Sequence, residues 1–152
     1  MPVCQTKFHG SLEYAPEQVL QVPHGLFGFA SETEFLLLEI PSLRPLVFVQ
    51  STRTANLCFL SLPVQIVDPG YQLSLRSIDL VEFGYSSEQQ PQIGQNLLCL
   101  TLLTVNEKQG TTANLQAPLV IDVQRHQGIQ AIVNGEYSHR VPVTPERLRP
   151  AC

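Results

Sequence analysis

Twelve prolines divide the 152 residues of this chain into short segments. A proline interrupts a helix because it lacks a backbone N–H and its ring collides with the preceding turn, so no long helix can run through these positions. They are Pro2, Pro16, Pro23, Pro41, Pro45, Pro63, Pro69, Pro91, Pro118, Pro142, Pro145 and Pro150. The chain is therefore expected to fold from short elements. Its length indicates one domain, residues 1–152, with one core.

The segments between the prolines have the hydrophobic patterns of β-strands. Residues 71–75 and 119–123 alternate apolar and polar side chains, which predicts two strands that are buried on one face. A more continuous apolar pattern, typical of strands covered on both faces or lining a barrel, occupies residues 35–40, 46–50, 57–62 and 97–105.

A β-hairpin is predicted around Asn134 and Gly135. These residues separate two strand-like segments, 129–133 and 136–139. Asn and Gly both tolerate the positive φ that a type I′ turn requires, so the pair is typical of a two-residue hairpin turn.

A short helix is predicted to begin at Ser77 and end at Gly84. Ser77 is a candidate N-cap, Asp79 suits the positive end of a helix, and Gly84 can terminate it. The intervening residues supply apolar surface, and the helix has two turns at most.

Many short strands joined by turn residues predict an all-β fold. We expect an antiparallel small barrel or sandwich with one or two short helices. At the end of the chain, Arg147 and Arg149 lie close to Pro145 and Pro150, so residues 142–152 are expected to form a basic tail.

The chain carries few charges, since Asp, Glu, Lys and Arg make up only 14% of it and the net charge is −4. An average soluble domain contains roughly 25% of these residues. A protein that grips phosphate backbones needs a basic surface, so direct binding to nucleic acid is not expected. The first residues lack the pattern of a signal peptide, and Thr101 and Thr104 interrupt the longest apolar run. We therefore expect a cytoplasmic protein that does not enter the membrane.

No common catalytic motif is present, neither G-x-S-x-G nor the glycine-rich phosphate-binding patterns. The four histidines share no metal-ligand spacing. No catalytic residue, metal or cofactor is therefore predicted. Glu32 and Glu34 form a pair of acids that is more typical of a solvated edge than of acid–base catalysis.

Two features with a possible chemical role have simpler structural interpretations. Gly25 and Gly28 have the spacing of an RNA-clamping loop, but the residues between them are apolar and no Lys or Arg lies nearby. A glycine turn packed with its apolar neighbours Leu26, Phe27 and Phe29 is the better explanation. The cysteines, which form no C-x-x-C pair, are predicted to be buried free thiols. They are Cys4, Cys58, Cys99 and Cys152.

Five elements along the chain match, in order, the pattern of one known family. Residues 6–10 (Thr-Lys-Phe-His-Gly) and 22–29 (Val-Pro-His-Gly-Leu-Phe-Gly-Phe) come first. Residues 48–51 (Phe-Val-Gln-Ser) and 68–71 (Asp-Pro-Gly-Tyr) follow, and the most specific element is residues 113–122 (Ala-Asn-Leu-Gln-Ala-Pro-Leu-Val-Ile-Asp). Together these elements resemble the flagellar assembly factors of the FliW family.

The resemblance, which covers about residues 3–141, implies a binding protein without catalytic activity. It implies that the chain binds flagellin and, when free of flagellin, binds the translational regulator CsrA. Binding of CsrA would relieve the repression of flagellin synthesis. No cofactor is implied, and we expect a monomer.

Five polar residues inside or beside the matching elements are the candidate partner contacts: Gln50, Ser51, Asp68, Tyr71 and Asn114. A structural role is an alternative for each, because buried amides satisfy backbone groups and a tyrosine often belongs to a core. Two other functions stay open. One is a small β-barrel module that binds a different protein or a ligand, and the other is a thiol enzyme assembled from a Cys and a His.

Overall fold

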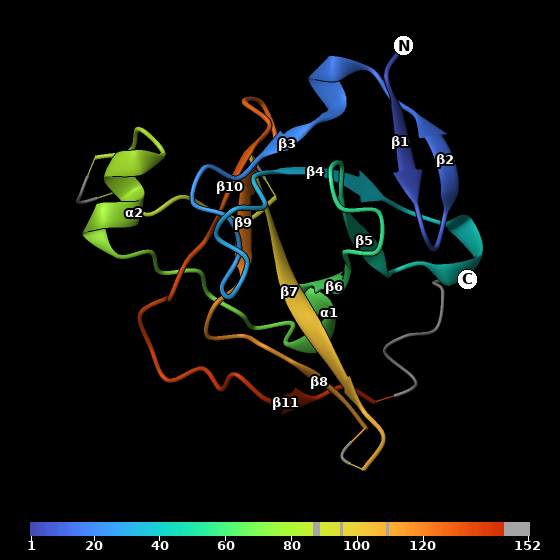
Figure 1. The fold of residues 1–152 in the computed structure, drawn as a ribbon. Coiled ribbons are helices and arrows are strands. Elements are labelled where there is room, and N and C mark those ends of the chain that lie inside the picture. Colours follow the sequence, from blue (N-terminus) through green and yellow to red (C-terminus); the bar gives the residue numbers. More distant parts are fainter. Residues whose placement is uncertain (87–88, 95, 109, 145–152) are drawn as a thin grey trace.

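The computed structural model describes residues 1–86, 89–94, 96–108 and 110–144, and its centre is a closed barrel of strands (Figure 1). Each strand pairs with the next around the barrel, and the last pairs with the first. Their order is β7 (Leu97–Asn106), β6 (Cys58–Pro63), β5 (Val47–Ser51), β4 (Glu34–Leu38), β3 (Leu20–Gln21), β10 (Gln127–Gln130) and β9 (Leu119–Asp122). Closure leaves these strands without exposed edges along most of the barrel. The predicted all-β barrel is confirmed.

The barrel differs from the predicted antiparallel sheet at one pairing. β3 and β10 run parallel, with Gln21 opposite Gln127, and the Gln21 N–H donates to the carbonyl of His126 at 2.8 Å. Parallel neighbours need a long connection, and here most of the chain lies between the two strands. Local hydrophobic patterns do not report strand direction, so the sequence could not reveal this pairing.

Side chains alternate along β7 between two hydrophobic cores. Leu98, Leu100 and Leu102 belong to the core inside the barrel, whereas Leu97 and Cys99 belong to an outer core. The barrel interior also contains Leu20, Val22, Leu26, Phe35, Leu37, Val47, Val49, Phe59, Leu119 and Ile121. The continuous apolar pattern at the start of β7 therefore reflects a strand that is covered on both faces, as predicted.

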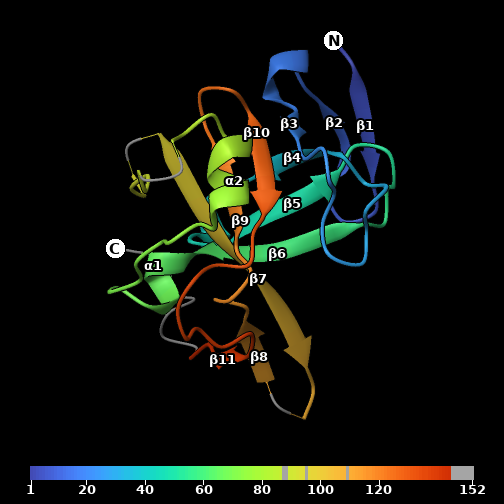
Figure 2. The same ribbon diagram turned by 90° about the vertical axis from the view of Figure 1, so that its left-hand side faces the viewer.

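Two short α-helices cover the outer core, and Figure 2 shows α2 beside β10 on the outside of the barrel. The helices are α1 (Val64–Val67) and α2 (Ser77–Glu82), and two 3-10 turns are η1 (Pro16–Gln18) and η2 (Pro41–Leu43). The predicted helix is confirmed, but its N-cap is Arg76 rather than Ser77. Gly84 ends it at φ +81°, and the N–H of Tyr85 donates to the carbonyl of Leu80 at 2.9 Å.

Four further strands lie outside the barrel. β1 (Val3–Thr6) and β2 (Gly10–Glu13) form a separate hairpin, and β8 (Gly110–Ala113) and β11 (Val141–Pro142) extend from the second half of β7. Pro142 is in β11 and Val143 is buried, so residues 142–144 of the predicted tail belong to the folded structure. The rest of that predicted tail, residues 145–152, lies outside the described residues.

The predicted hairpin around Asn134 is wrong. Asn134 has no positive φ, although Gly135 does, so a type I′ turn does not form. The segment after β10 instead follows the loop before β9, with the Val133 N–H donating to the carbonyl of Gln116 at 2.9 Å, and residues 136–139 form no strand. A distant segment competes successfully for the backbone groups that the hairpin would have used.

The predicted strand at residues 71–75 is also absent. Its alternation is real, because Tyr71, Leu73 and Leu75 are buried and Gln72 is exposed. The segment lies against the outer core without a strand partner, so the pattern reports one buried face and not a sheet. β9 is confirmed as a strand, but it is buried on both faces rather than one.

The glycine turn between β3 and β4 inserts one side chain into the barrel. Leu26 is buried there, and the N–H of Phe27 donates to Oε1 of Gln130 at 2.7 Å. Of the turn's other two apolar neighbours, Phe29 packs edge-on against the ring of Phe59, with the centroids 5.2 Å apart, and stays 40% exposed, whereas Phe27 is 54% exposed. The turn presents two aromatic side chains to solvent from a loop that is fixed to the barrel.

Candidate partner-binding site

Gln50 holds the loop between β5 and β6 from inside. Its side chain is fully buried, and its Nε2 donates to the carbonyl oxygens of Ser51, Ala55 and Leu57 at 3.0, 3.3 and 3.1 Å. The carbonyl of Thr54 lies at 3.5 Å. The Oε1 atom is buried and has no hydrogen-bond partner among the described residues. The amide therefore replaces the hydrogen bonds that water would otherwise supply to this loop.

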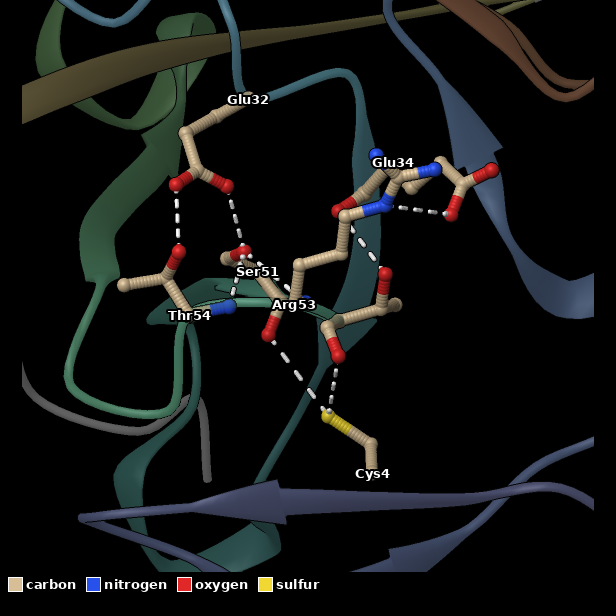
Figure 3. A network of polar contacts seen from close by, with 7 residues as sticks. Cys4, Glu32, Glu34, Ser51, Arg53 and Thr54 are labelled. Carbon is tan, nitrogen blue, oxygen red and sulfur yellow. Dashed lines mark hydrogen bonds and ion pairs between the residues drawn. The ribbon is translucent and has the colours of Figure 1, made fainter.

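Ser51 joins the same loop to the segment before β4 (Figure 3). Its Oγ donates to Oε2 of Glu32 at 2.7 Å and accepts the N–H groups of Arg53 and Thr54. The hydroxyl of Thr54 donates to the other oxygen of Glu32. These hydrogen bonds, that of Thr54 first and that of Ser51 second, lower the pKa of Glu32 below its ordinary value of 4.5. Glu32 is therefore an anchor of the loop, and not the solvated edge that was expected.

The N-terminal hairpin ties the loop down from its other side. The thiol of Cys4 points at the carbonyls of Ser51 and Thr52, with Sγ···O distances of 3.6 and 3.7 Å. The N–H of Lys7 donates to the carbonyl of Ala55 at 2.8 Å. An exposed loop with this many internal bonds is held in one shape, as a preorganised binding surface requires.

The anchor at Glu32 predicts an acid-sensitive stability. A carboxylate whose pKa is lowered on folding stabilises the fold above its unfolded pKa, and this stability is lost as the pH falls through the folded pKa. Between about pH 5 and about pH 3, the wild type should therefore lose more stability than Glu32→Gln. The midpoint of urea unfolding, measured across this pH range for the wild type and for Glu32→Gln, tests this prediction. Glu17→Gln on η1 is the matched control. If the wild type and Glu32→Gln lose equal stability as the pH falls, Glu32 does not anchor the loop.

The other three candidates surround a different turn. Tyr71 is buried, its OH donates to the carbonyl of Leu115 at 2.7 Å, and burial raises its pKa. Asn114 accepts the N–H groups of Gln116 and Ala117 at its Oδ1, at 3.1 and 3.0 Å. Both side chains thus stabilise the same turn, Tyr71 through the carbonyl of Leu115 and Asn114 through the N–H groups of the next two residues.

Asp68 caps its own turn. Its Oδ1 accepts the N–H of Gly70 at 3.0 Å, and its side chain is half-buried. No hydrogen bond in the described part of the chain joins the turn around Leu115 to the loop that Gln50 holds. The five candidates therefore form two groups, Gln50 with Ser51 and Tyr71 with Asn114. Asp68 joins the second group, because the N–H of Tyr71 donates to its carbonyl at 3.0 Å.

The sequence analysis missed the polar residues that complete the β5–β6 loop, Arg53 and Thr54. Arg53 forms an ion pair with Glu34 at 3.6 Å. A local signal was present, because a run of hydroxyl residues directly after a strand favours turns in which side chains bond to nearby N–H groups. The contribution of Glu32 had no such signal, since it comes from a different segment.

The thiols lack the character of a catalytic nucleophile. Burial raises the pKa of Cys58 to about 11 and that of Cys99 to about 12, and it also raises that of Cys4. Sγ of Cys58 lies 3.8 Å from Nε2 of His9, yet a thiol with a raised pKa carries little thiolate. These three cysteines are free, as predicted, with Cys58 only partly buried. Cys152 lies outside the described residues.

Within residues 1–86, 89–94, 96–108 and 110–144, no three His, Cys, Asp or Glu side chains are grouped so that they could hold a metal ion. The same residues contain no helix with the length and apolar character needed to cross a membrane.

Comparison with known proteins identifies the family. The sequence model described as FliW protein matches residues 3–143. The chain belongs to the FliW family. A FliW of Desulfitobacterium hafniense strain Y51 is 36% identical over 142 residues, which cover 92% of this chain and 89% of that protein. A FliW of Geobacillus sp. strain WCH70 is 31% identical over 145 residues, covering 94% and 96%.

A solved FliW structure has the same fold. The crystal structure of the flagellar assembly factor FliW superposes with a TM-score of 0.80 at 30% identity, covering 95% of this chain and 99% of that one. The family resemblance predicted from the motifs is confirmed. The chain is a flagellar assembly factor, and it is not an enzyme, because FliW is a non-enzymatic assembly factor. This rules out the alternative of a thiol enzyme.

Proposed function

We propose that this FliW protein binds flagellin in the cytoplasm and binds CsrA when flagellin is absent. Capture of CsrA would relieve repression of flagellin synthesis, and secretion of flagellin would free the FliW protein to do so. The two partners compete by mass action, so the protein reports the amount of unexported flagellin. Membership in a family of flagellar assembly factors supports this proposal.

The observation that carries the proposal is an exposed apolar surface on α2. Ile78 and Val81 are 69% and 64% exposed and stand one turn apart on α2. Glu82 of the same helix contacts His24, at the start of the loop whose aromatic side chains are exposed. We name the side chains of Ile78 and Val81 the α2 surface.

Such a surface suits an amphipathic helix of a partner. Exposed apolar side chains on a rigid scaffold bury the apolar stripe of a helix, with anchors spaced at three and four residues. The protein would act as a monomer, with one surface available to one partner at a time.

The candidate residues divide between two roles in this proposal. Gln50, Ser51 and Tyr71 are buried, so we propose that they position exposed loops rather than contact a partner with their side chains. Asp68 and Asn114 are half-buried, and their free faces can meet a partner directly.

The test is a competition between purified partners. The wild type should co-elute with its cognate flagellin, and added flagellin should release CsrA from it. Ile78→Ser combined with Val81→Ser should weaken flagellin binding tenfold or more, because two exposed apolar contacts are each worth about 1 kcal/mol or more when buried. Leu43→Ser, an exposed apolar position on η2, is the matched control. Absence of a complex with both partners at micromolar concentrations would defeat the proposal.

A further inference from the structure

The second half of β7, together with β8 and β11, forms a three-stranded ribbon beside the barrel (Figure 1). Thr104 lies opposite Thr112, and Thr112 lies opposite Pro142 in the next strand. Continuing this register by two residues places Arg140 beside Asn114. Since side chains of register partners share a face, the two threonines, Asn114 and Arg140 gather on one face of the ribbon.

A hollow of about 380 Å³ lies on this face. We call it the β7–β8 groove, and the described residues that line it have polar or cationic side chains: Thr104, Asn106, Thr112, Asn114, His139 and Arg140. None of these six described lining residues is acidic. None of these six residues belongs to the loop that Gln50 holds or to the α2 surface.

Arg140 differs from the other described arginines in having no carboxylate partner among residues 1–86, 89–94, 96–108 and 110–144. The other four are paired, Arg44 with Glu39, Arg53 with Glu34, Arg76 with Asp79 and Arg125 with Asp122, at 3.9, 3.6, 3.2 and 3.8 Å. In an acidic protein with few bases, an arginine without an internal partner is the one positioned to accept an external acid.

The neighbouring groups are arranged as donors. Oδ1 of Asn114 is occupied by two backbone N–H groups, which turns its Nδ2 into the group that remains for a ligand. The hydroxyls of Thr104 and Thr112 can each donate, and the guanidinium of Arg140 offers a planar fork that matches a carboxylate.

We propose that the β7–β8 groove binds a carboxylate group of a protein partner, with Arg140 as its main contact. The lining residues are largely exposed, and an open groove retains a free ion poorly. An acidic side chain carried on a larger partner gains from contacts made elsewhere on the surface. The inference rests on the proposed function only for the identity of that partner.

A titration of the labelled full chain with sodium acetate, followed by NMR at constant ionic strength, tests the groove itself. Acetate should give saturable shifts at the backbone amides of Thr104, Thr112, Asn114 and Arg140. Arg140→Gln should need about tenfold more acetate, because a charge-assisted contact is lost. Arg44→Gln, which removes an exposed arginine from another segment, should behave like the wild type. Chemical-shift changes that spread over the whole surface, or that Arg140→Gln leaves unaltered, would show that the groove is not a carboxylate site.

A parallel titration with inorganic phosphate separates the two kinds of oxyanion. Saturation by phosphate at a lower concentration than by acetate would overturn the assignment to a carboxylate. Affinities of the same variants for flagellin and CsrA then test the partner. Arg140→Gln should weaken at least one of them about tenfold while Arg44→Gln weakens neither. Two unchanged affinities would overturn the role in partner binding, whereas a wild type that binds neither protein would refute the proposed function and leave the acetate result standing.

Discussion

Gly25→Ala is expected to lower the free energy of unfolding by about 3 kcal/mol or more. Gly25 has a φ of +67°, a conformation that costs an L-residue about 1–2 kcal/mol. A Cβ at this position would lie 2.4 Å from the carbonyl oxygen of Phe29 and 2.6 Å from Cα of Ala30. Both are backbone atoms, so the whole loop must move, and with it Leu26 in the barrel interior.

Gly28→Ala is the matched control for that variant. Gly28 also has a positive φ, +84°, but a Cβ there meets no atom within 4 Å. Only the cost of the positive φ applies to this variant. Its free energy of unfolding is therefore expected to fall by about 1 kcal/mol. Urea unfolding of the two variants measures the difference directly. Equal losses for Gly25→Ala and Gly28→Ala would show that the close backbone approach is not what requires glycine at position 25.

Gln50→Ala is expected to destabilise the protein by about 3 kcal/mol. The substitution leaves a cavity where a fully buried side chain stood, and it removes the Nε2 donor from the carbonyls of the β5–β6 loop. The cavity and the loss of these hydrogen bonds both cost free energy. Gln65→Ala, the same change at an exposed position on α1, should cost less than about 0.5 kcal/mol.

Hydrogen exchange separates a local effect of Gln50→Ala from a global one. If Gln50 organises the loop, the amides of Thr54 and Leu57 should lose protection even under conditions where the barrel remains folded. Their N–H groups donate to Ser51 and Thr54 within the loop, so their exchange reports its order. Unchanged protection at these amides would mean that Gln50 fills space without shaping the loop.

The continuously apolar segments and the short helix were predicted correctly. β4 to β7 correspond to the four continuously apolar segments, and α2 corresponds to the segment that ends at Gly84. The apolar residues of β4 to β7 are buried or half-buried, except Val105. The resemblance of five ordered motifs also predicted the FliW family correctly, because such motifs follow the chain and need no knowledge of the fold.

Predictions failed where a distant segment competed with a local signal. The Asn134 turn lost its strand partner because the segment after β10 bonds to the loop before β9. Glu32 was interpreted as a solvated acid because nothing near it in the sequence shows that Ser51 and Thr54 donate to it. In both cases the decisive contact joins residues that are far apart in the chain.

The amino-acid sequence by itself determined that this chain folds from short strands, that it lacks the motifs of the common enzymes, and that it is a FliW protein. Only the tertiary structure decided which of the polar candidates are buried and which remain accessible at the surface. Gln50 and Asn114 have chemically similar side chains, but Gln50 is enclosed by its own loop while Asn114 stands at the edge of an open groove. Burial depends on what the closing barrel brings against each residue, and a local sequence pattern carries no record of those contacts.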